Sequence, residues 1–464
     1  MAVNLQEAHY CGLFSQSNVY GLSDVCLPGG KNKLLVASLR GKVMSMEFQN
    51  TRPLAKEVHF TYIPADAEIV SIDAFKKSSY GNGVVIGISF IKTTENKPCQ
   101  FLNIYSAWEP DSEYDLESIA QGCQNLELDF VPYQLSHAQL FSSNSSETVF
   151  LLAGSDLKVH MYREDRQKHT FSAESSDPYF PEFRDLAHTV SYFDCKTCAN
   201  NRRITALGCQ NGLVKFFVVD AENAEILQQY SIQHDNMITS AELFNLESNI
   251  QAPVFVKEVL ETEEEGSEET SIPEWHLVVV SALEVSVVYR NVEQSGFSDP
   301  LVLADSERYD SALCCHVTDV DLDGENEILI GTYGQELLVY KYERPKTKID
   351  VQTIKSSEYD LNAKPSDENL ARRQSLISKA GLGHGDGDYQ LIWQRSFPKP
   401  ILALDDLDIT SDGLQEIVVL TLSGLHVLQH DLNYVSSLCQ KRLKQFAKLQ
   451  HQGDVFQQLL QESL

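Results

Sequence analysis

The chain has 464 residues and a formal net charge of −29, from 37 basic and 66 acidic side chains. Its length allows a large core or several domains, and its 42% apolar content is ordinary for a soluble globular protein. So negative a field repels nucleic-acid phosphates and anionic lipid, which predicts no nucleic-acid partner. The first residues lack a secretory leader, and no apolar run reaches the roughly 20 residues of a membrane span, so we expect a cytoplasmic protein without direct membrane insertion.

Seven predicted hairpins follow one another along the chain, each an apolar run, a small turn and a second strand. They are Leu34–Phe48, Val84–Tyr105, Val149–Tyr162, Ile204–Val219, Leu277–Tyr289, Asp319–Tyr342 and Asp408–Gln429. The first strand of each is nearly all apolar, which indicates burial on both faces, and the second tends to alternate. Further predicted strands lie between the hairpins, at 58–63, 67–75, 391–397 and 401–405. Four-stranded units repeated in this way predict an all-β, seven-bladed β-propeller over residues 1–433.

Three insertions account for the spacing between the hairpins. Residues 109–128 carry apolar side chains at helical spacing. The second insertion, at about 258–271, is an acidic low-complexity loop. The third, at about 343–389, is rich in Lys, Ser, Asp and Gly, and we expect both of these insertions to be flexible. Ser375 in the last insertion follows Arg372-Arg373 and resembles a phosphorylation site directed by basic residues.

The tail, residues 434–464, predicts a C-terminal helix of mixed apolar and basic character. Val435 and Leu438 begin its apolar side, and its basic residues are Lys441, Arg442, Lys444 and Lys448. Two interpretations stay open: a helix packed on the rim of the propeller, or a helix that binds a partner.

Two acidic turns precede the last two hairpins with the same spacing of polar residues. The first contains Asp319, Asp321, Asp323, Gly324 and Glu327, and the second contains Asp408, Thr410, Asp412, Gly413 and Glu416. Alternating carboxylates around a bend at glycine can direct several oxygens to one point, which is what Ca²⁺ requires. The alternative is a turn held by its own hydrogen bonds from side chain to backbone.

These turns resemble the calcium-binding turn of FG-GAP repeats in the propellers of integrin α-subunits, D-x-D-x-D-G-x-x-D. The resemblance implies Ca²⁺ at Asp319, Asp321, Asp323 and Glu327, and a weaker site at Asp408, Thr410, Asp412 and Glu416. The sequence departs from that pattern at Glu327 and Glu416, which stand in place of the last Asp, and at Thr410.

Catalytic motifs are missing from the sequence: there is no G-x-S-x-G elbow, P-loop, G-x-G-x-x-G after a strand or H-E-x-x-H. Cys195 and Cys198 have the spacing of half a zinc site, but no second pair completes it. We therefore predict a protein that is not an enzyme and has no cofactor other than the Ca²⁺ considered above. The enzyme alternative predicts a pocket with shifted acid or base groups near the central channel.

Long stretches spread over nearly the whole chain resemble the kaptin family. They are 14–22 (FSQSNVYGL), 62–73 (YIPADAEIVSID), 101–121, 206–212 (ALGCQNG), 318–324 (TDVDLDG), 332–342 (TYGQELLVYKY), 391–397 (LIWQRSF) and 412–416 (DGLQE). The resemblance implies a scaffold subunit of the KICSTOR complex. Such a subunit associates with the lysosome through its partners, helps recruit the GATOR complex and restrains the TOR growth kinase when amino acids or glucose are scarce.

The resemblance also implies particular partners and places in the cell. Within KICSTOR the expected neighbour is another propeller protein of the FG-GAP type. The alternative function that it implies is association with actin filaments in lamellipodia and stereocilia, for which the basic tail is the candidate surface. No catalytic residues come with the family.

Overall fold

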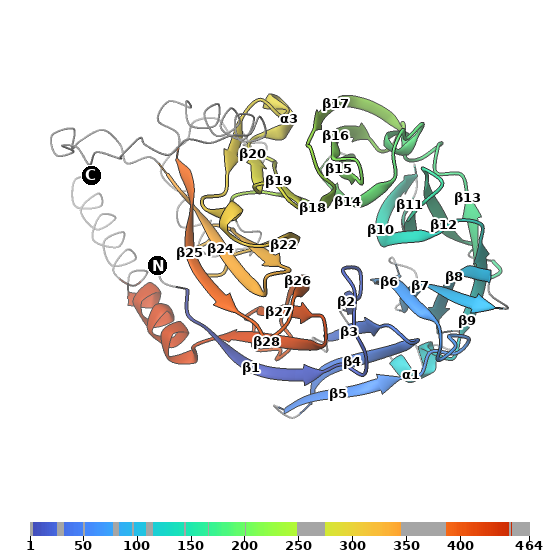
Figure 1. The fold of residues 1–464 in the computed structure, drawn as a ribbon, viewed down its shortest axis with the longest axis horizontal. Helices are drawn as coiled ribbons and strands as arrows, with labels where there is room; N and C mark the ends of the chain where they lie inside the picture. Colours follow the sequence, from blue (N-terminus) through green and yellow to red (C-terminus); the bar gives the residue numbers. More distant parts are fainter. Residues whose placement is uncertain are drawn as a thin grey trace, which may run out of the picture.

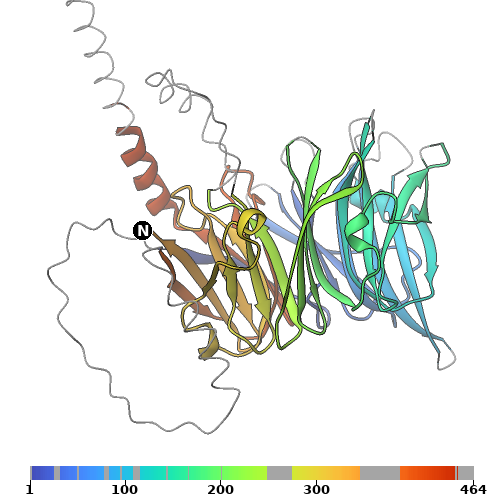
Figure 2. The ribbon, with the colours of Figure 1, turned by 90° about the horizontal axis from the view of Figure 1, so that it is seen from above.

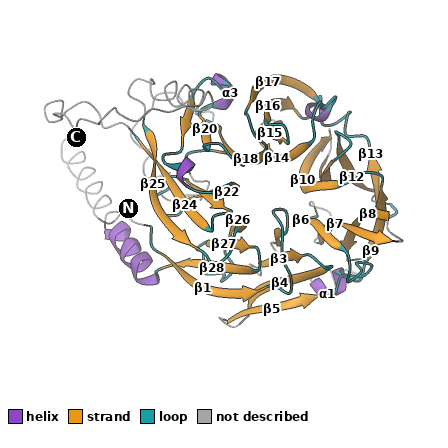
Figure 3. Cartoon of the chain, in the orientation of Figure 1, coloured by secondary structure: helices purple, strands orange, loops and turns teal. Residues whose placement is uncertain are grey.

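The protein is a seven-bladed β-propeller, described here by a computed structural model in which seven four-stranded antiparallel sheets surround a central axis (Figure 1). Strands dominate the chain, and the few helices are short apart from the one that follows the last blade (Figure 3). The structure describes residues 3–25, 32–49, 52–77, 83–94, 97–107, 115–142, 145–165, 167–199, 201–247, 274–344, 387–444 and 447. Predictions for residues 258–271, Ser375 and Lys448, and for most of 343–389, lie outside these ranges.

The blades follow the chain, and each is built from its innermost strand outwards. Blade 1 contains β2 (Leu22–Val25), β3 (Lys33–Ser38), β4 (Lys42–Gln49) and β5 (Arg52–Val58). Blade 2 contains β6 (Glu68–Lys76), β7 (Val84–Thr94), β8 (Lys97–Ser106) and β9 (Cys123–Leu128). Blade 3 contains β10 (Pro132–Ser142), β11 (Ser145–Gly154), β12 (Val159–Asp165) and β13 (Thr170–Glu174). Blade 4 contains β14 (Val190–Thr197), β15 (Arg202–Cys209), β16 (Leu213–Asp220) and β17 (Glu225–Gln233).

The remaining three blades continue the same order around the ring. Blade 5 contains β18 (Ile238–Phe244), β19 (His276–Ser281), β20 (Val287–Tyr289) and β21 (Pro300–Val302). Blade 6 contains β22 (Ala312–Thr318), β23 (Glu327–Thr332), β24 (Glu336–Glu343) and β25 (Asp388–Ser396). Blade 7 contains β26 (Ile401–Leu407), β27 (Glu416–Thr421), β28 (Gly424–His430) and β1 (Leu5–Gly12). Short helices lie at α1 (Leu116–Ile119), η2 (Pro181–Phe183), α3 (Val292–Ser295) and η4 (Ser306–Arg308).

Blade 7 joins the two ends of the chain. Its three inner strands come from the end of the propeller sequence, and β1 from the beginning pairs antiparallel with β28, from Leu5 opposite His430 to Gly12 opposite Gly424. The first described strand therefore closes the ring.

The cores explain why the hairpins could be read from the sequence. Seven apolar clusters fill the structure, and each lies between two adjacent blades. In β3, Leu34 packs toward blade 7, whereas its neighbour Leu35 packs toward blade 2. The second strand of each blade, which is the first strand of the predicted hairpin, is apolar on both faces because a neighbouring blade lies on either side of it.

The seven predicted hairpins are the second and third strands of the seven blades, and the predicted fold class is confirmed. Two details were wrong. Residues 59–63 are not a strand, since β5 ends at Val58. Residues 109–128 are not simply an insertion, because their described part contains α1 and then β9, the outer strand of blade 2.

The C-terminal helix begins at residue 432 and is described to residue 444 (Figure 2). Asp431 caps it by accepting a hydrogen bond from the Asn433 backbone amide at 2.9 Å. Leu438 is buried, but Leu432 and Leu443 are 57% and 67% exposed, so the helix meets the propeller along a narrow contact. Among the described residues, no helix has the length and apolarity to span a membrane.

Candidate functional site

The first acidic turn connects β22 to β23 at the end of the innermost strand of blade 6. Gly324 has a φ of +96°, a conformation that favours glycine, and lets the chain bend back. Both carboxylate oxygens of Asp319 face the bend: Oδ1 accepts from the Asp323 amide at 3.0 Å, and Oδ2 accepts from the Gly324 amide at 2.8 Å. Asp319 therefore holds the backbone of its own turn.

The other three predicted ligands converge on a lysine of β24. The Lys341 Nζ donates to Asp321 Oδ2 at 2.8 Å, to Asp323 Oδ2 at 2.7 Å and to Glu327 Oε1 at 2.7 Å. The Asp321 and Glu327 side chains are fully buried, and Lys341 is 14% exposed. Burial alone would lower the pKa of Lys341, but these carboxylates raise it above its ordinary value, so the ammonium remains charged.

The second acidic turn repeats this geometry between β26 and β27. Asp408 accepts hydrogen bonds from the amides of Asp412 at 3.1 Å and Gly413 at 2.9 Å, as Asp319 does in the first turn. Glu416 Oε1 then accepts from the Thr410 hydroxyl at 3.0 Å and from the Gln429 Nε2 at 3.2 Å. In this turn, therefore, the Glu416 Oε1 atom accepts hydrogen bonds from two uncharged side chains.

The first turn was the predicted Ca²⁺ site, and its residues do not fit that ion as they are arranged. Ca²⁺ takes six to eight oxygen ligands, whereas the oxygens that converge here surround the three donors of an ammonium group. Asp319, Asp321 and Glu327 each place one carboxylate oxygen within 4.8 Å of the others. The expectation that these carboxylates lie close together is therefore met. The sequence did not indicate Lys341, which follows Glu327 by 14 residues.

The CxxC pair does not form a metal site among the described residues. Cys195 lies on β14 and accepts a hydrogen bond from the Thr205 hydroxyl at 3.6 Å. Burial raises the pKa of Cys195 to about 12 and also raises that of Cys198, which favours neutral thiols. Both cysteines are free.

Ionisable side chains line the innermost strands, a feature that the sequence reading missed. Six of these strands contain a register shift in their pairing, and the residue two positions beyond each shift is ionisable: Asp73, His137, Asp194, Glu242, His316 and Asp405. A cavity of about 200 Å³ at the centre is lined by residues from the innermost strands of all seven blades. These ionisable residues stand among mixed polar and apolar residues, so the sequence of each strand alone did not single them out.

Pairs of these groups connect neighbouring blades. His137 of blade 3 contacts Asp73 of blade 2 with an Nδ1–Oδ2 distance of 2.9 Å.

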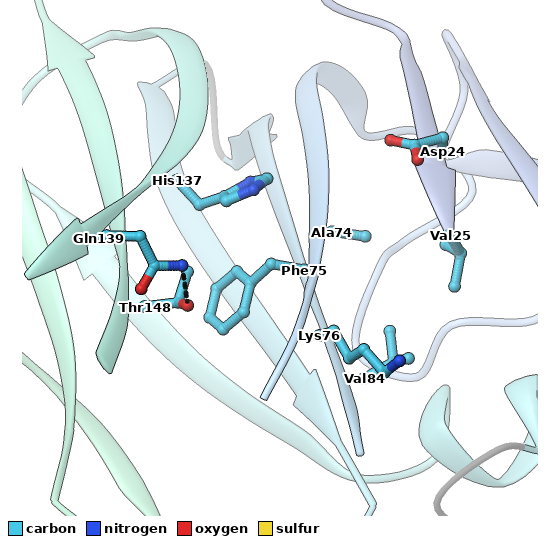
Figure 4. Close-up of a pocket in the computed structure, with 9 residues that line it drawn as sticks. All are labelled: Asp24, Val25, Ala74, Phe75, Lys76, Val84, His137, Gln139 and Thr148. Atoms are coloured by element: carbon cyan, nitrogen blue, oxygen red, sulfur yellow. Dashed lines mark hydrogen bonds between the residues drawn. The ribbon is translucent and has the colours of Figure 1, made fainter. Parts of the chain in front are cut away.

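A second cavity, of about 270 Å³, lies beside His137 and is also lined by Asp24 and Phe75 (Figure 4). On its wall the Gln139 Nε2 donates to the Thr148 hydroxyl at 3.0 Å (Figure 4).

His316 connects three blades. Its Nε2 lies 2.6 Å from Asp406 Oδ1 of blade 7, and its Nδ1 lies 3.7 Å from Glu242 Oε1 of blade 5. Burial alone would lower the pKa of His316, but Glu242 and Asp406 raise it to about 9. These shifted groups pair with one another, so they cross-link the inner strands.

We expect His316 to stabilise the propeller in a manner that depends on pH. Because its folded pKa is raised, the stabilisation is complete below its ordinary value of about 6.5 and is lost as pH rises through about 9. The difference in unfolding free energy between the wild type and His316→Gln should shrink by about 1–3 kcal/mol from about pH 6 to about pH 9.5. Urea unfolding at both values measures this, and His59→Gln, at a histidine that is 85% exposed, is the control that should show no change. A difference that grows with pH would contradict the assignment.

Comparison with known proteins adds the family. The model of the family described as "KICSTOR complex protein kaptin" matches residues 5–440. The chain is 40% identical over 455 residues to the KICSTOR complex protein kaptin of Mus musculus, covering 97% of this chain and 93% of the mouse protein. The chain belongs to the kaptin family. This match runs from β1 into the C-terminal helix, so every described strand of this kaptin-family chain lies within it.

One solved structure shares the fold of this kaptin-family chain at low identity, and a second superposes with a lower TM-score. BBS1N, from its complex with ARL6DN soaked with mercury, superposes with a TM-score of 0.51 at 10% identity, covering 93% of this chain and 98% of BBS1N. The Dos1 propeller gives a TM-score of 0.48 at 8% identity, with coverage of 92% and 95%. At 10% identity, the similarity to BBS1N concerns the fold alone.

Proposed function

We propose that this chain is a non-enzymatic scaffold subunit of the KICSTOR complex. In this role it helps recruit the GATOR complex to the lysosome and restrains the TOR growth kinase when amino acids or glucose are scarce. The observation that carries the proposal is membership of the kaptin family over residues 5–440, together with 40% identity to a protein named as part of KICSTOR. Its neighbours are other KICSTOR subunits, including a propeller of the FG-GAP type.

One side of the disc supports a role in protein contact. Of the thirteen large hydrophobic residues that are exposed in the described part of the chain, eight lie in loops from an outer strand to the next blade, or in turns between second and third strands. Both kinds of loop end on the same side of a propeller, because the strands of each blade are antiparallel. This loop face contains Phe14, Val19, Tyr62, Val131, Leu157, Met237, Leu283 and Tyr333. Exposed apolar residues on one face are candidates for burial by a partner.

Charge supports attachment to the lysosome through partners. At −29, the chain is repelled by anionic lipid, so its place on the membrane depends on proteins that bind it. The scaffold is cytoplasmic and peripheral in this proposal.

The experiment is affinity purification of the tagged full-length chain from cells that express all KICSTOR subunits. We expect the wild type to recover them and the triple variant Leu157→Glu, Leu283→Glu, Tyr333→Glu to lose most of them, because carboxylates would have to be desolvated in the interface. Leu227→Glu on β17, at a residue that is 50% exposed but outside the loop face, is the matched control. Recovery of no KICSTOR subunit by the wild type would end the proposal.

A second candidate function, binding of actin filaments, is favoured by the C-terminal helix. Lys441, Arg442 and Lys444 are all exposed on it, and they offer a local basic surface in an acidic chain to an acidic filament. Co-sedimentation of the purified chain with filaments, with and without residues 434–464, distinguishes this candidate. Pelleting that requires those residues supports it, and absence of pelleting at moderate salt removes it.

A further inference from the structure

The first acidic turn has the oxygen chemistry of a cation site, and its cation belongs to the chain itself. Three carboxylate oxygens from Asp321, Asp323 and Glu327 lie 2.7–2.8 Å from one atom, Lys341 Nζ. Buried carboxylates need a compensating positive charge, and two of these three are fully buried. We propose that Lys341 is the built-in cation of this turn, occupying the place that a divalent ion would take and making the turn independent of metal.

The second turn supports this assignment independently. Lys341 and Gln429 occupy equivalent positions, since each follows the residue that pairs with the first isoleucine of the second strand of its blade: Ile328 of β23 with Tyr340, and Ile417 of β27 with Leu428. Where the first turn has Asp321, the second has Thr410, so the second has one carboxylate fewer. At the equivalent position the ammonium is replaced by a neutral amide, which contacts Glu416. The turn with the additional carboxylate therefore has the charged donor Lys341, and the turn without it has the uncharged donor Gln429.

The turn held by Lys341 also supports two neighbouring segments. The Asn326 backbone amide donates to the Leu246 carbonyl at 2.7 Å, which ties the turn to the segment that follows β18 in blade 5. The Arg442 guanidinium of the C-terminal helix donates to the Leu322 carbonyl. Leu322 has a φ of +61°, which is unfavourable for a leucine and is maintained by the surrounding turn. Loss of the ammonium should therefore loosen the contact between helix and propeller.

The first arm of the test uses the full-length wild type. Its Tm should be the same within about 1 °C in millimolar CaCl2 and in EDTA, because an ion that does not bind the folded state cannot stabilise it. Isothermal titration with CaCl2 should show no saturable binding. A wild-type Tm that rises with Ca²⁺ and falls with EDTA, together with saturable binding, would overturn the proposal.

The second arm removes the ammonium. Lys341→Met keeps the apolar stem but removes the positive charge that the carboxylates face, so its Tm should fall, and CaCl2 should raise it again by at least about 3 °C. Lys77→Met is the matched control, since Lys77 is a half-buried lysine that pairs with the single carboxylate of Glu164 at 2.9 Å. Its Tm should not respond to CaCl2. A folded Lys341→Met that ignores CaCl2 would overturn the assignment.

The third arm covers the case in which Lys341→Met does not fold. Asp321→Thr with Lys341→Gln gives the first turn the Thr and Gln donors of the second. We expect this double variant to fold, to have a higher Tm than Lys341→Gln alone and to show no response to CaCl2. Failure of the double variant to fold, or a Tm no higher than that of Lys341→Gln, would count against Lys341 as the charge partner of the turn.

Discussion

Replacing Glu182 with alanine should lower the free energy of unfolding by about 3–5 kcal/mol, because it leaves the Arg203 guanidinium charged and buried without its partner. Arg203 is the largest fully buried side chain, and its Nε donates to Glu182 Oε1 at 2.7 Å. The Glu182 carboxylate also accepts from the Thr205 hydroxyl at 3.1 Å. The pair ties η2, in the loop that leads into blade 4, to strand β15.

Urea unfolding of the full-length chain measures this effect. The double variant Glu182→Leu with Arg203→Met is the control, since replacing both charges by apolar groups of similar size removes the uncompensated ion. It should recover most of the loss. If Glu182→Ala costs less than about 1 kcal/mol, or the double variant is the less stable of the two, the pair is not a buried ion pair of this kind.

Deletion of residues 1–12 should abolish cooperative folding of the propeller. The deletion removes β1 and the buried side chains of Val3 and Leu5, and it leaves seven residues of β28 without their pairing partners. The combined loss of these hydrogen bonds and apolar contacts is comparable to the whole stability of a domain, about 5–15 kcal/mol. The deletion also leaves β28 as an unpaired edge, which promotes aggregation.

Differential scanning calorimetry and size-exclusion chromatography would report this outcome. We expect the single transition of the full-length chain to be lost and the protein to elute as aggregate. Removal of residues 445–464 from the other end is the control, since it leaves the 28 strands that the structure describes in place and should preserve the transition. A monomeric deletion variant with an unchanged Tm would show that blade 7 does not need its outer strand.

The sequence was most informative where burial is symmetrical. Strands such as Ile328–Ile330 are apolar on both faces because a blade covers each side, and turns such as Asn211–Gly212 mark their ends. The innermost strands carry mixed polar and apolar residues, and the outermost strands are half exposed, so neither gives so clear a pattern. This is why β9 was placed within a helical insertion.

The candidate site depended on a contact that spacing cannot show. The acidic residues of the first turn are local in sequence, and their convergence followed from a bend at Gly324. Lys341 reaches them only because β24 pairs with β23 in one particular register, with Tyr340 opposite Ile328. Shifting that register by one residue would turn the lysine to the other face of the blade. The cross-links around His316 likewise join strands from three blades, and no local pattern predicts them.

Closure of blade 7 has a consequence for synthesis of the chain. Strand β1 leaves the ribosome before the other described strands, but its partner β28 lies about 420 residues later, so at the common rate of about 5–20 residues per second β1 waits roughly 20–80 seconds for it. During that interval β1 is unpaired, and the blades that have already been synthesised lack the partner that closes the ring. Chaperones that shield strand edges are therefore expected to associate with the nascent chain, and a stop codon anywhere before β28 should yield a product that is degraded.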